Sequence, residues 1–259
     1  MIDTLFIDLD CTLLDSSGAV KLLFNNFSEK FFGNSNLGEE IKNSFKKYCN
    51  DANQTLPHTD YLKNIGCGWD NMFYTDFSGS DSRLTDLKNV SANYKHFVIK
   101  SLLEEFSIYE NAIIKLMEAF LYEKWVIYYK CYSDTFSFLE ECEHYKKYIL
   151  TNGFTDIQMK KIHHFNLHDK VDIIFIAGEY GIGKPFSDFF NIVLDITGAN
   201  IKSTAMIGNS LSSDIAGANN MGIKTIWKKE LITSDYERNI VPTAMIENLS
   251  EIPALLLSM

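Results

Sequence analysis

Two carboxylates stand directly after the first apolar run of the sequence. Asp8 and Asp10 follow residues 4–7, a short apolar run that is typical of a buried parallel strand. Ligands of doubly wound sheets bind beyond the carboxyl ends of the strands, so we expect both side chains where a substrate would arrive. Acids two residues apart can divide the work, one as nucleophile and the other as proton donor and acceptor. A polar loop with a helix-capping acid is the alternative, and the D-x-D-x-T string alone does not separate the two.

A hydroxyl follows the apolar run at residues 148–150. Thr151 is succeeded by Asn152 and Gly153. A hydroxyl with adjacent backbone donors can hold a phosphoryl oxygen, and Gly153 would let the backbone approach closely. The alternative is an ordinary strand-to-helix turn in which Thr155 caps the next helix.

A lysine comes third, in the segment Gly183-Lys184-Pro185. Pro185 fits the first turn of a helix, which places Lys184 just before that turn. An ammonium group there can offset phosphate charge and screen a nucleophilic carboxylate. A single lysine is more often solvated, so its significance comes from following the other two groups in order.

Oxygen-bearing side chains form the fourth group, from Asn209 to Asp214 after the apolar run at residues 205–207. Mg²⁺ prefers octahedral oxygen ligands and usually takes few carboxylates together with substrate phosphate and water. This loop and Asp8 could supply them. The alternative is a capped loop in which Ser212 or Ser213 opens the next helix.

The apolar runs before these groups predict the strands that position them. They cover residues 4–7, 148–150, 173–176, 205–207 and 224–227. Helical patterns alternate with them over residues 156–165, 185–196 and 213–221, and residues 244–257 predict a last strand and a covering helix. This alternation predicts βαβ units in an α/β fold, a Rossmann-like doubly wound parallel sheet.

Residues 16–134 have a different pattern, with apolar positions three and four residues apart. One such stripe is Leu22, Leu23, Phe27 and Phe31. Stripes of this kind predict amphipathic helices that pack on each other. We therefore expect a core formed by residues 1–15 and 135–259, with an inserted helical cap of residues 16–134.

The amino-acid composition limits the classes of molecule that we expect this chain to bind. The 259 residues contain 24 Lys and Arg against 34 Asp and Glu, a net charge of −10 with no basic run. A nucleic acid polymer is therefore not expected as a partner, whereas a small phosphorylated metabolite is, because a metal ion and a lysine can reverse the local sign. The 5 cysteines form no C-x-x-C pair. With neither a basic leader nor an uncharged apolar span, we expect a cytoplasmic protein without membrane contact.

Taken together, the four strand ends resemble the motifs of the haloacid dehalogenase superfamily, in the same order. The first motif is matched by Asp8, Asp10 and Thr12, the second by Thr151, the third by Lys184, and the fourth by Asn209 and Asp214. The resemblance spans residues 1–15 and about 135–230. Insertion of a helical block after the first motif resembles the subgroup with a helical cap. Residues 151–155 and 183–185 look most like the pyrimidine 5′-nucleotidase-type phosphatases.

The resemblance implies phosphoryl transfer through Asp8. Asp8 would attack phosphorus in line while Asp10 protonates the leaving oxygen, and Asp10 would then deprotonate the water that hydrolyses the aspartyl-phosphate. Mg²⁺ would bind the Asp8 carboxylate, the Asp10 carbonyl and the loop that carries Asn209 and Asp214. The residues expected to bind the substrate phosphate are Thr12, Thr151, Asn152 and Lys184. Dehalogenases of the family lack the second acid of the first motif, so Asp10 favours phosphoryl transfer.

Asn209 departs from the family pattern, which usually has an aspartate there that ligates Mg²⁺ directly. An amide oxygen can coordinate but carries no charge, so metal affinity should drop or Asp214 should take over. The expected function is Mg²⁺-dependent hydrolysis of a phosphate monoester, with a nucleoside 5′-monophosphate as the expected substrate and specificity from the cap. Two alternatives stay open. One is a weakly active or inactive binding or regulatory protein, and the other is a phosphosugar mutase.

Overall fold

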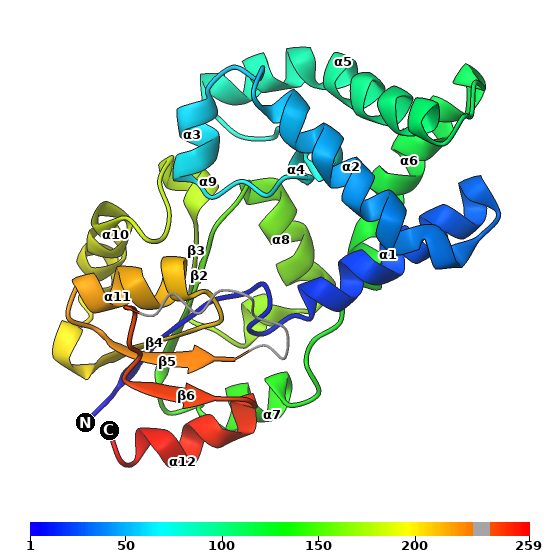
Figure 1. Ribbon diagram of the computed structural model, residues 1–259. Helices are drawn as coiled ribbons and strands as arrows, with labels where there is room; N and C mark the ends of the chain where they lie inside the picture. The colour runs from blue at the N-terminus through cyan, green and yellow to red at the C-terminus, as the bar shows by residue number, and fades with distance from the viewer. Residues whose placement is uncertain (230–238) are drawn as a thin grey trace.

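A parallel sheet forms the centre of the molecule. In the computed structural model, which describes residues 1–229 and 239–259, six strands are hydrogen-bonded in the order β3-β2-β1-β4-β5-β6 (Figure 1). The strands are β1 (Thr4–Ile7), β2 (Lys146–Thr151), β3 (Ile173–Ile176), β4 (Thr204–Gly208), β5 (Lys224–Lys228) and β6 (Ala244–Ile246). Every pairing between neighbours is parallel. The predicted α/β class and the predicted strands are confirmed.

Helices cover both faces of the sheet because the strand residues alternate between the faces. Leu5 and Ile7 face one apolar cluster and Phe6 faces the other. The first cluster receives side chains from α7 (Thr135–Glu141), α8 (Thr155–His164) and α12 (Ile252–Leu256). The second receives them from α10 (Ser187–Thr197) and α11 (Ala216–Asn220). The sheet is therefore doubly wound, as expected.

Helices, and no strand of the sheet, occupy the described chain between β1 and α7. They include α1 (Ser16–Phe32), α2 (Gly38–Asn53), α3 (Thr59–Asn64), α4 (Asn71–Tyr74), α5 (Ser82–Glu105) and α6 (Ile114–Lys124). Local caps delimit the first of them. The Asp15 side chain accepts a hydrogen bond from the amide of Gly18, and Gly33 ends α1 with a positive φ of 68°. Figure 1 shows these helices at one end of the molecule, beyond the sheet.

This helical segment has an apolar cluster of its own that also includes Phe154, Ile157 and Ala177 from the sheet region. Two stretches of chain connect it with the sheet and lie side by side. The amide of Asp15 donates to the carbonyl of Lys130 at 2.8 Å. The division into a core and a cap at residues 16–134 stays a prediction, because the shared cluster joins the two parts.

Two predicted helix starts differ from the structure. Pro185 was expected in the first turn of a helix, but α10 begins at Ser187, so Lys184 and Pro185 lie in the preceding turn. The helix expected from residue 213 begins instead as a π-helical turn, Leu211–Ile215, opened by the Ser210 side chain, and continues as α11. Among the described residues, no helix has the length and apolar character needed to cross a membrane.

Candidate active site

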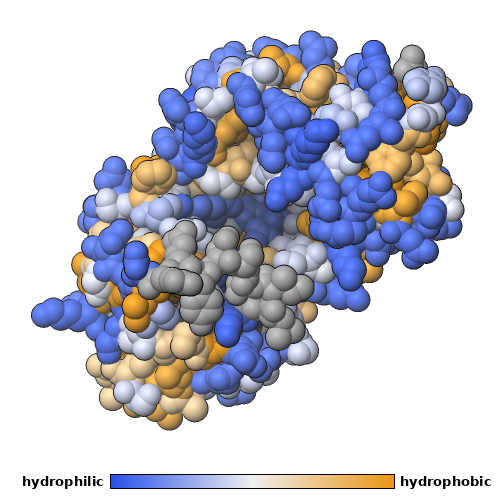
Figure 2. All heavy atoms as spheres, in the orientation of Figure 1, coloured by the Kyte–Doolittle hydropathy of each residue, from blue (hydrophilic) through white to orange (hydrophobic). Residues whose placement is uncertain are grey.

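The polar residues singled out at the strand ends meet at the carboxyl edge of the sheet. Asp8 follows β1, Thr151 ends β2, and Gly208 ends β4. Lys184 arrives from the loop between α9 (Ala177–Tyr180) and α10. Neighbouring parallel strands end side by side, which explains why residues so distant in sequence come together. Figure 2 shows hydrophilic surface around the hollow where the helical segment meets the sheet.

Lys184 connects the nucleophile candidate with the fourth group. Its Nζ lies 2.6 Å from Oδ1 of Asp8, 2.7 Å from Oδ1 of Asp214 and 2.6 Å from the carbonyl oxygen of Leu150. The contacts with Asp8 and Leu150 are hydrogen bonds, whereas the contact with Asp214 is an ion pair in which Oδ1 of Asp214 accepts no hydrogen bond. Burial disfavours the charged form, but Asp214 and Asp8 outweigh it and raise the pKa of Lys184. The ammonium is therefore charged and fixed between two buried carboxylates.

The pKa of Asp8 is raised as well, which for an acid disfavours the charged form. Burial and the nearby charge of Asp214 raise the pKa of Asp8, although Lys184 works in the other direction. When both acids are ionised, two negative charges face one positive charge, so this buried trio keeps a net charge of −1. A buried uncompensated charge is costly. The trio therefore has the electrostatic character of a cation site.

The geometry around Asp214 fits an oxygen-ligand metal site. Its Oδ2 accepts a hydrogen bond from the Ser210 amide at 3.0 Å, and a Cβ on Gly208 would come within 2.3 Å of the same oxygen. Within the described part of the chain, no group of three or more His, Cys, Asp or Glu side chains is placed to hold a metal. Mg²⁺ needs no such group, because it is commonly held by one or two carboxylates, waters and substrate phosphate. Asp8 and Asp214 fit that smaller donor set.

Asn209 lies between β4 and this loop. Its backbone carbonyl accepts a hydrogen bond from Nε1 of Trp227 at 2.8 Å, and its side chain is half-buried. Trp227 thus anchors the start of the loop from the neighbouring strand β5. The loop backbone is held in place while the Asn209 amide adds no charge to the trio.

The four expected phosphate-binding residues have different contacts. The Thr12 hydroxyl donates to Oδ2 of Asp8 at 3.1 Å and so orients the carboxylate. The Asn152 amide makes two hydrogen bonds with the backbone of Lys184, at 2.8 Å and 2.9 Å, which fixes the lysine loop. The Thr151 hydroxyl accepts from Nε2 of Gln158. Lys184, as described above, contacts the nucleophile candidate directly.

Asp10 belongs to a second charged group, and its partners in that group lie outside the four sequence motifs. Nζ of Lys161 lies 2.8 Å from each of its carboxylate oxygens, Gln158 donates to Oδ2 at 2.8 Å, and the Ser16 hydroxyl donates to Oδ1. Burial works against the charged form, but Lys161, Ser16 and Gln158 together lower the pKa of Asp10. Asp10 is therefore a carboxylate held by donors on both oxygens.

Sequence reasoning missed Gln158 and Lys161. Both are buried on the face of α8 that also buries Ile157 and Ile162. A lysine at an apolar helical position, shortly after a candidate catalytic threonine, is the signal that could have identified them. Ser16 has no comparable signal, because it is the first residue of α1 and resembles an ordinary helix-start serine.

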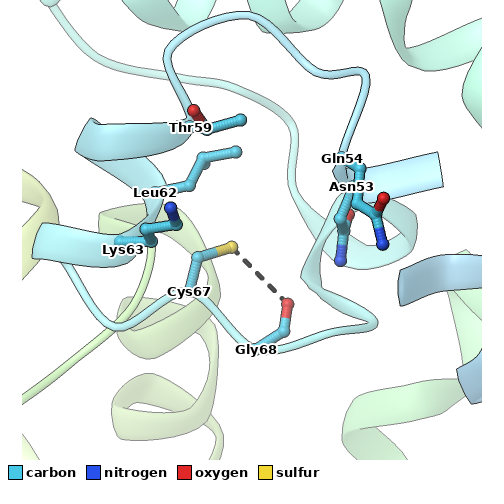
Figure 3. Close-up of a pocket in the computed structure, with 7 residues that line it drawn as sticks. All are labelled: Asn53, Gln54, Thr59, Leu62, Lys63, Cys67 and Gly68. Carbon is cyan, nitrogen blue, oxygen red and sulfur yellow. Dashed lines mark hydrogen bonds between the residues drawn. The ribbon is translucent and has the colours of Figure 1, made fainter. Parts of the chain in front are cut away.

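A cavity of about 390 Å³ opens in the helical segment, between the end of α2 and α3 (Figure 3). Polar side chains line much of it, among them Asn53, Gln54, Thr59 and Lys63. The loop at its edge reaches the site, because the carbonyls of Asn64 and Ile65 accept hydrogen bonds from the amides of Gly183 and Gly153. The chain segment between the lining residues Lys63 and Cys67 therefore contacts the loops that carry Lys184 and Thr151.

Comparison with known proteins identifies a family of hydrolases. A family model of haloacid dehalogenase-like hydrolases matches residues 2–222. Among curated relatives, a phosphoserine phosphatase of Thermus thermophilus is 30% identical over 136 residues, covering 52% of this chain and 54% of the relative. Pyrimidine 5′-nucleotidase YjjG of Escherichia coli is 33% identical over 109 residues, covering 42% and 48%. Pyrimidine 5′-nucleotidase PynA of Streptococcus pneumoniae is 39% identical over 84 residues, covering 32% and 35%. The chain thus spans about half the length, or less, of the curated relatives it matches.

Solved structures share the fold over the whole chain. The HAD-hydrolase YfnB of Bacillus subtilis, solved bound to magnesium, aligns with a TM-score of 0.65 at 22% identity and covers 98% of both chains. An L-2-haloacid dehalogenase of Xanthobacter autotrophicus aligns with a TM-score of 0.64 at 17% identity over 100% of both chains. At these identities the likeness establishes the fold.

Proposed function

Because the chain belongs to the haloacid dehalogenase-like hydrolases, we propose that it is a Mg²⁺-dependent phosphohydrolase that forms an aspartyl-phosphate on Asp8. The observation that carries the proposal is the buried trio of Asp8, Lys184 and Asp214 at the carboxyl edge of the sheet. It combines an oriented carboxylate with one fixed cation and, when both acids are ionised, an uncompensated negative charge. A phosphate dianion would need a further cation to approach such a site.

Asp8 is the nucleophile. Thr12 and Lys184 each engage one oxygen of its carboxylate, which fixes its plane. An Asp8 oxygen forms the new bond to phosphorus as the ester oxygen departs, and Asp10 gives that oxygen a proton. Asp10 acts in the first step in its protonated form and is left as a carboxylate, which then takes a proton from the water that attacks the aspartyl-phosphate. This step releases inorganic phosphate, frees the Asp8 carboxylate and returns Asp10 to its protonated form.

Several residues support charge on the transferring group. Lys184 faces Asp8 and lies where it can offset charge on the phosphoryl oxygens, and the Thr151 hydroxyl can donate to one of them. The Asn152 side chain contributes by holding the lysine loop rather than by binding phosphate. Bound by Asp8, the Asp10 carbonyl, Asn209 and Asp214, Mg²⁺ would supply neutralising charge for the substrate phosphate.

The proposed substrate is a small phosphorylated metabolite, with a nucleoside 5′-monophosphate as the first candidate. Two of the similar proteins are named pyrimidine 5′-nucleotidases. Asp10 supports phosphoryl transfer over dehalogenation, because the leaving oxygen of a phosphate ester needs a proton donor.

A panel of phosphate monoesters tests this function. Nucleoside 5′-monophosphates, phosphoserine, sugar phosphates and para-nitrophenyl phosphate are each incubated with Mg²⁺, and released phosphate is measured. We expect release with Mg²⁺ and its loss on chelation, with pyrimidine nucleotides preferred. An isomerised sugar phosphate without phosphate release would identify a mutase instead, and no reaction across the panel would contradict the proposal.

A further inference from the structure

We propose that Lys161 is a positioning residue that holds Asp10 in the orientation needed for proton transfer. This inference rests on the proposed function and deepens it, because it assigns a role to a residue outside the four family motifs. Lys161 acts through Asp10 and touches neither the nucleophile nor the expected path of the phosphoryl group.

The contacts of the Asp10 carboxylate define its orientation. Nζ of Lys161 lies 2.8 Å from Oδ1 and 2.8 Å from Oδ2, so the ammonium group faces both oxygens together. Gln158, one turn earlier on α8, adds a bond to Oδ2, and Ser16 from α1 adds one to Oδ1. A carboxylate held by donors at both oxygens cannot rotate about its terminal bond without breaking charge-assisted bonds.

The helical segment fixes the other side of Lys161. Its Nζ lies 4.9 Å from the ring centre of Tyr129 and 5.9 Å from that of Trp125, both of which follow α6. Rings at these distances attract an ammonium group. Burial alone would lower the pKa of Lys161, but the nearby Asp10 raises it, so the side chain stays charged. The position of the ammonium group therefore depends on α8 and on the helical segment together.

Burying a lysine costs free energy, so a contribution to folding stability does not explain why this position carries a lysine. Lys161 is only 5% exposed, and well-packed apolar side chains often replace buried ion pairs at no cost in stability. What an apolar side chain cannot do is present two charge-assisted contacts to a catalytic carboxylate. Gln158 supports the same interpretation, because its amide donates to both Asp10 and Thr151, two residues of the proposed site.

A double-mutant cycle with a matched control tests the role. Lys161→Met is made in the natural chain and in the Asp10→Asn background, and Lys160→Met serves as control. Lys160 is the adjacent lysine on α8, and it pairs with Asp76 of the helical segment at 2.7 Å rather than with Asp10. Single-turnover phosphoryl transfer is followed with phenyl phosphate, a poor leaving group, and with para-nitrophenyl phosphate, a good one.

We expect Lys161→Met to slow transfer from phenyl phosphate by about 10- to 100-fold, part of the 10²–10⁴-fold contribution of a general acid, and to slow para-nitrophenyl phosphate less. In the Asp10→Asn background it should cause no further loss, because residues that act through one group are non-additive. Lys161→Arg should recover part of the rate, and Lys160→Met should leave the ratio between the two esters unchanged.

Equal losses for both esters, or additive losses with Asp10→Asn, would overturn the positioning role and leave the proposed function intact. If Lys161→Met does not fold, as judged by circular dichroism, Lys161→Gln carries the same comparison. A natural chain that transfers no phosphoryl group from either ester would contradict the proposed function itself, and the role of Lys161 with it.

Discussion

The charge balance around Asp8 decides how tightly the site can hold a cation. Lys184 brings one positive charge to the two acids Asp8 and Asp214, so one negative charge is uncompensated when both are ionised. Asn209 lies at the start of the same loop and contributes an amide instead of a further charge. A divalent ion is held by the charge it meets as well as by its ligand geometry, so position 209 is a sensitive place to change the metal affinity.

Replacing this amide by a carboxylate should tighten Mg²⁺ binding. We expect Asn209→Asp to lower the Mg²⁺ concentration for half-maximal turnover by on the order of tenfold, because one added charge near a partly desolvated ion contributes about 1 kcal/mol or more. When Mg²⁺ is removed by a chelator, Asn209→Asp should also unfold at a lower urea concentration than the natural chain, because a third carboxylate joins the buried trio. Titration of turnover with Mg²⁺ measures the first effect.

Ser212→Asp is the matched control, because it adds the same charge to an exposed position of the same loop. It should change the Mg²⁺ requirement little. An unchanged or higher requirement in Asn209→Asp would mean that position 209 does not contact the metal.

For individual residues, the sequence predicts the polar groups that follow the strands, but it does not predict the partners that orient these groups. Asp8 and Thr151 stand out because each comes at the end of an apolar run, and Lys184 stands out because it follows them in order just before a predicted helix. The contacts of Asp10 with Gln158 and Lys161 join residues about 150 positions apart, 148 and 151 in sequence. Only the tertiary placement of α8 creates them, and no local pattern encodes that placement. The bonds of the Asn152 amide with the lysine loop are tertiary as well, so no local pattern predicts them.

Strands were the most predictable elements. The runs at residues 4–7 and 173–176 match β1 and β3, and the others differ from β2, β4 and β5 by one or two residues at their ends. Strands buried on both faces read as continuous apolar runs, which explains this agreement. The start of α10 was less predictable, because a proline suits the turn before a helix as well as its first turn.

The end of β4 offers a test of how an element positions a catalytic side chain. A Cβ on Gly208 would lie 2.3 Å from Oδ2 of Asp214, so Gly208→Ala must displace that carboxylate or the strand end. We expect turnover to fall at least tenfold and stability to fall by about 1–3 kcal/mol, the usual cost of overpacking. Turnover and urea unfolding of the purified variant measure the two effects.

The Mg²⁺ concentration for half-maximal turnover separates a displacement of Asp214 from a general loss of stability. It should rise in Gly208→Ala, because Asp214 is a proposed ligand. A variant that loses stability but keeps its turnover and its Mg²⁺ requirement would show that Asp214 need not occupy this position.

At the scale of the whole molecule, α8 joins the sheet to the helical segment. The Asp156 carboxylate accepts hydrogen bonds from the Thr75 hydroxyl, at 3.0 Å, and from the amide of Asp76. Lys160 pairs with Asp76 one turn later. The same helix holds Asp10 through Lys161, so the docking of the helical segment and the orientation of the proposed acid share one element (Figure 1).

Loosening this docking should weaken substrate capture. We expect Asp156→Ala to lower kcat/KM by about 3- to 10-fold, mainly through a higher KM, because each lost hydrogen bond to a charged group is worth about 1.5–3 kcal/mol and solvent will replace part of it. Steady-state kinetics on the preferred substrate measure the change.

Asp188→Ala is the matched control, since Asp188 occupies the equivalent place in the first turn of α10. Both substitutions remove the favourable interaction of an acid with a helix start, which contributes about 0.3–1 kcal/mol. A KM that rises equally in both variants would attribute the effect to helix stability rather than to docking.

The central claim is that Asp8 carries the phosphoryl group, and trapping the labelled intermediate tests it most directly. The substrate is para-nitrophenyl phosphate with labelled phosphorus, quenched in acid and followed by peptide mapping. In Asp10→Asn the good leaving group departs with little need of the acid, while hydrolysis lacks its base, so label should accumulate on the peptide that contains Asp8. Asp8→Asn should show neither label nor turnover. Label on another residue, or an Asp8→Asn variant that retains near-normal turnover, would contradict the account.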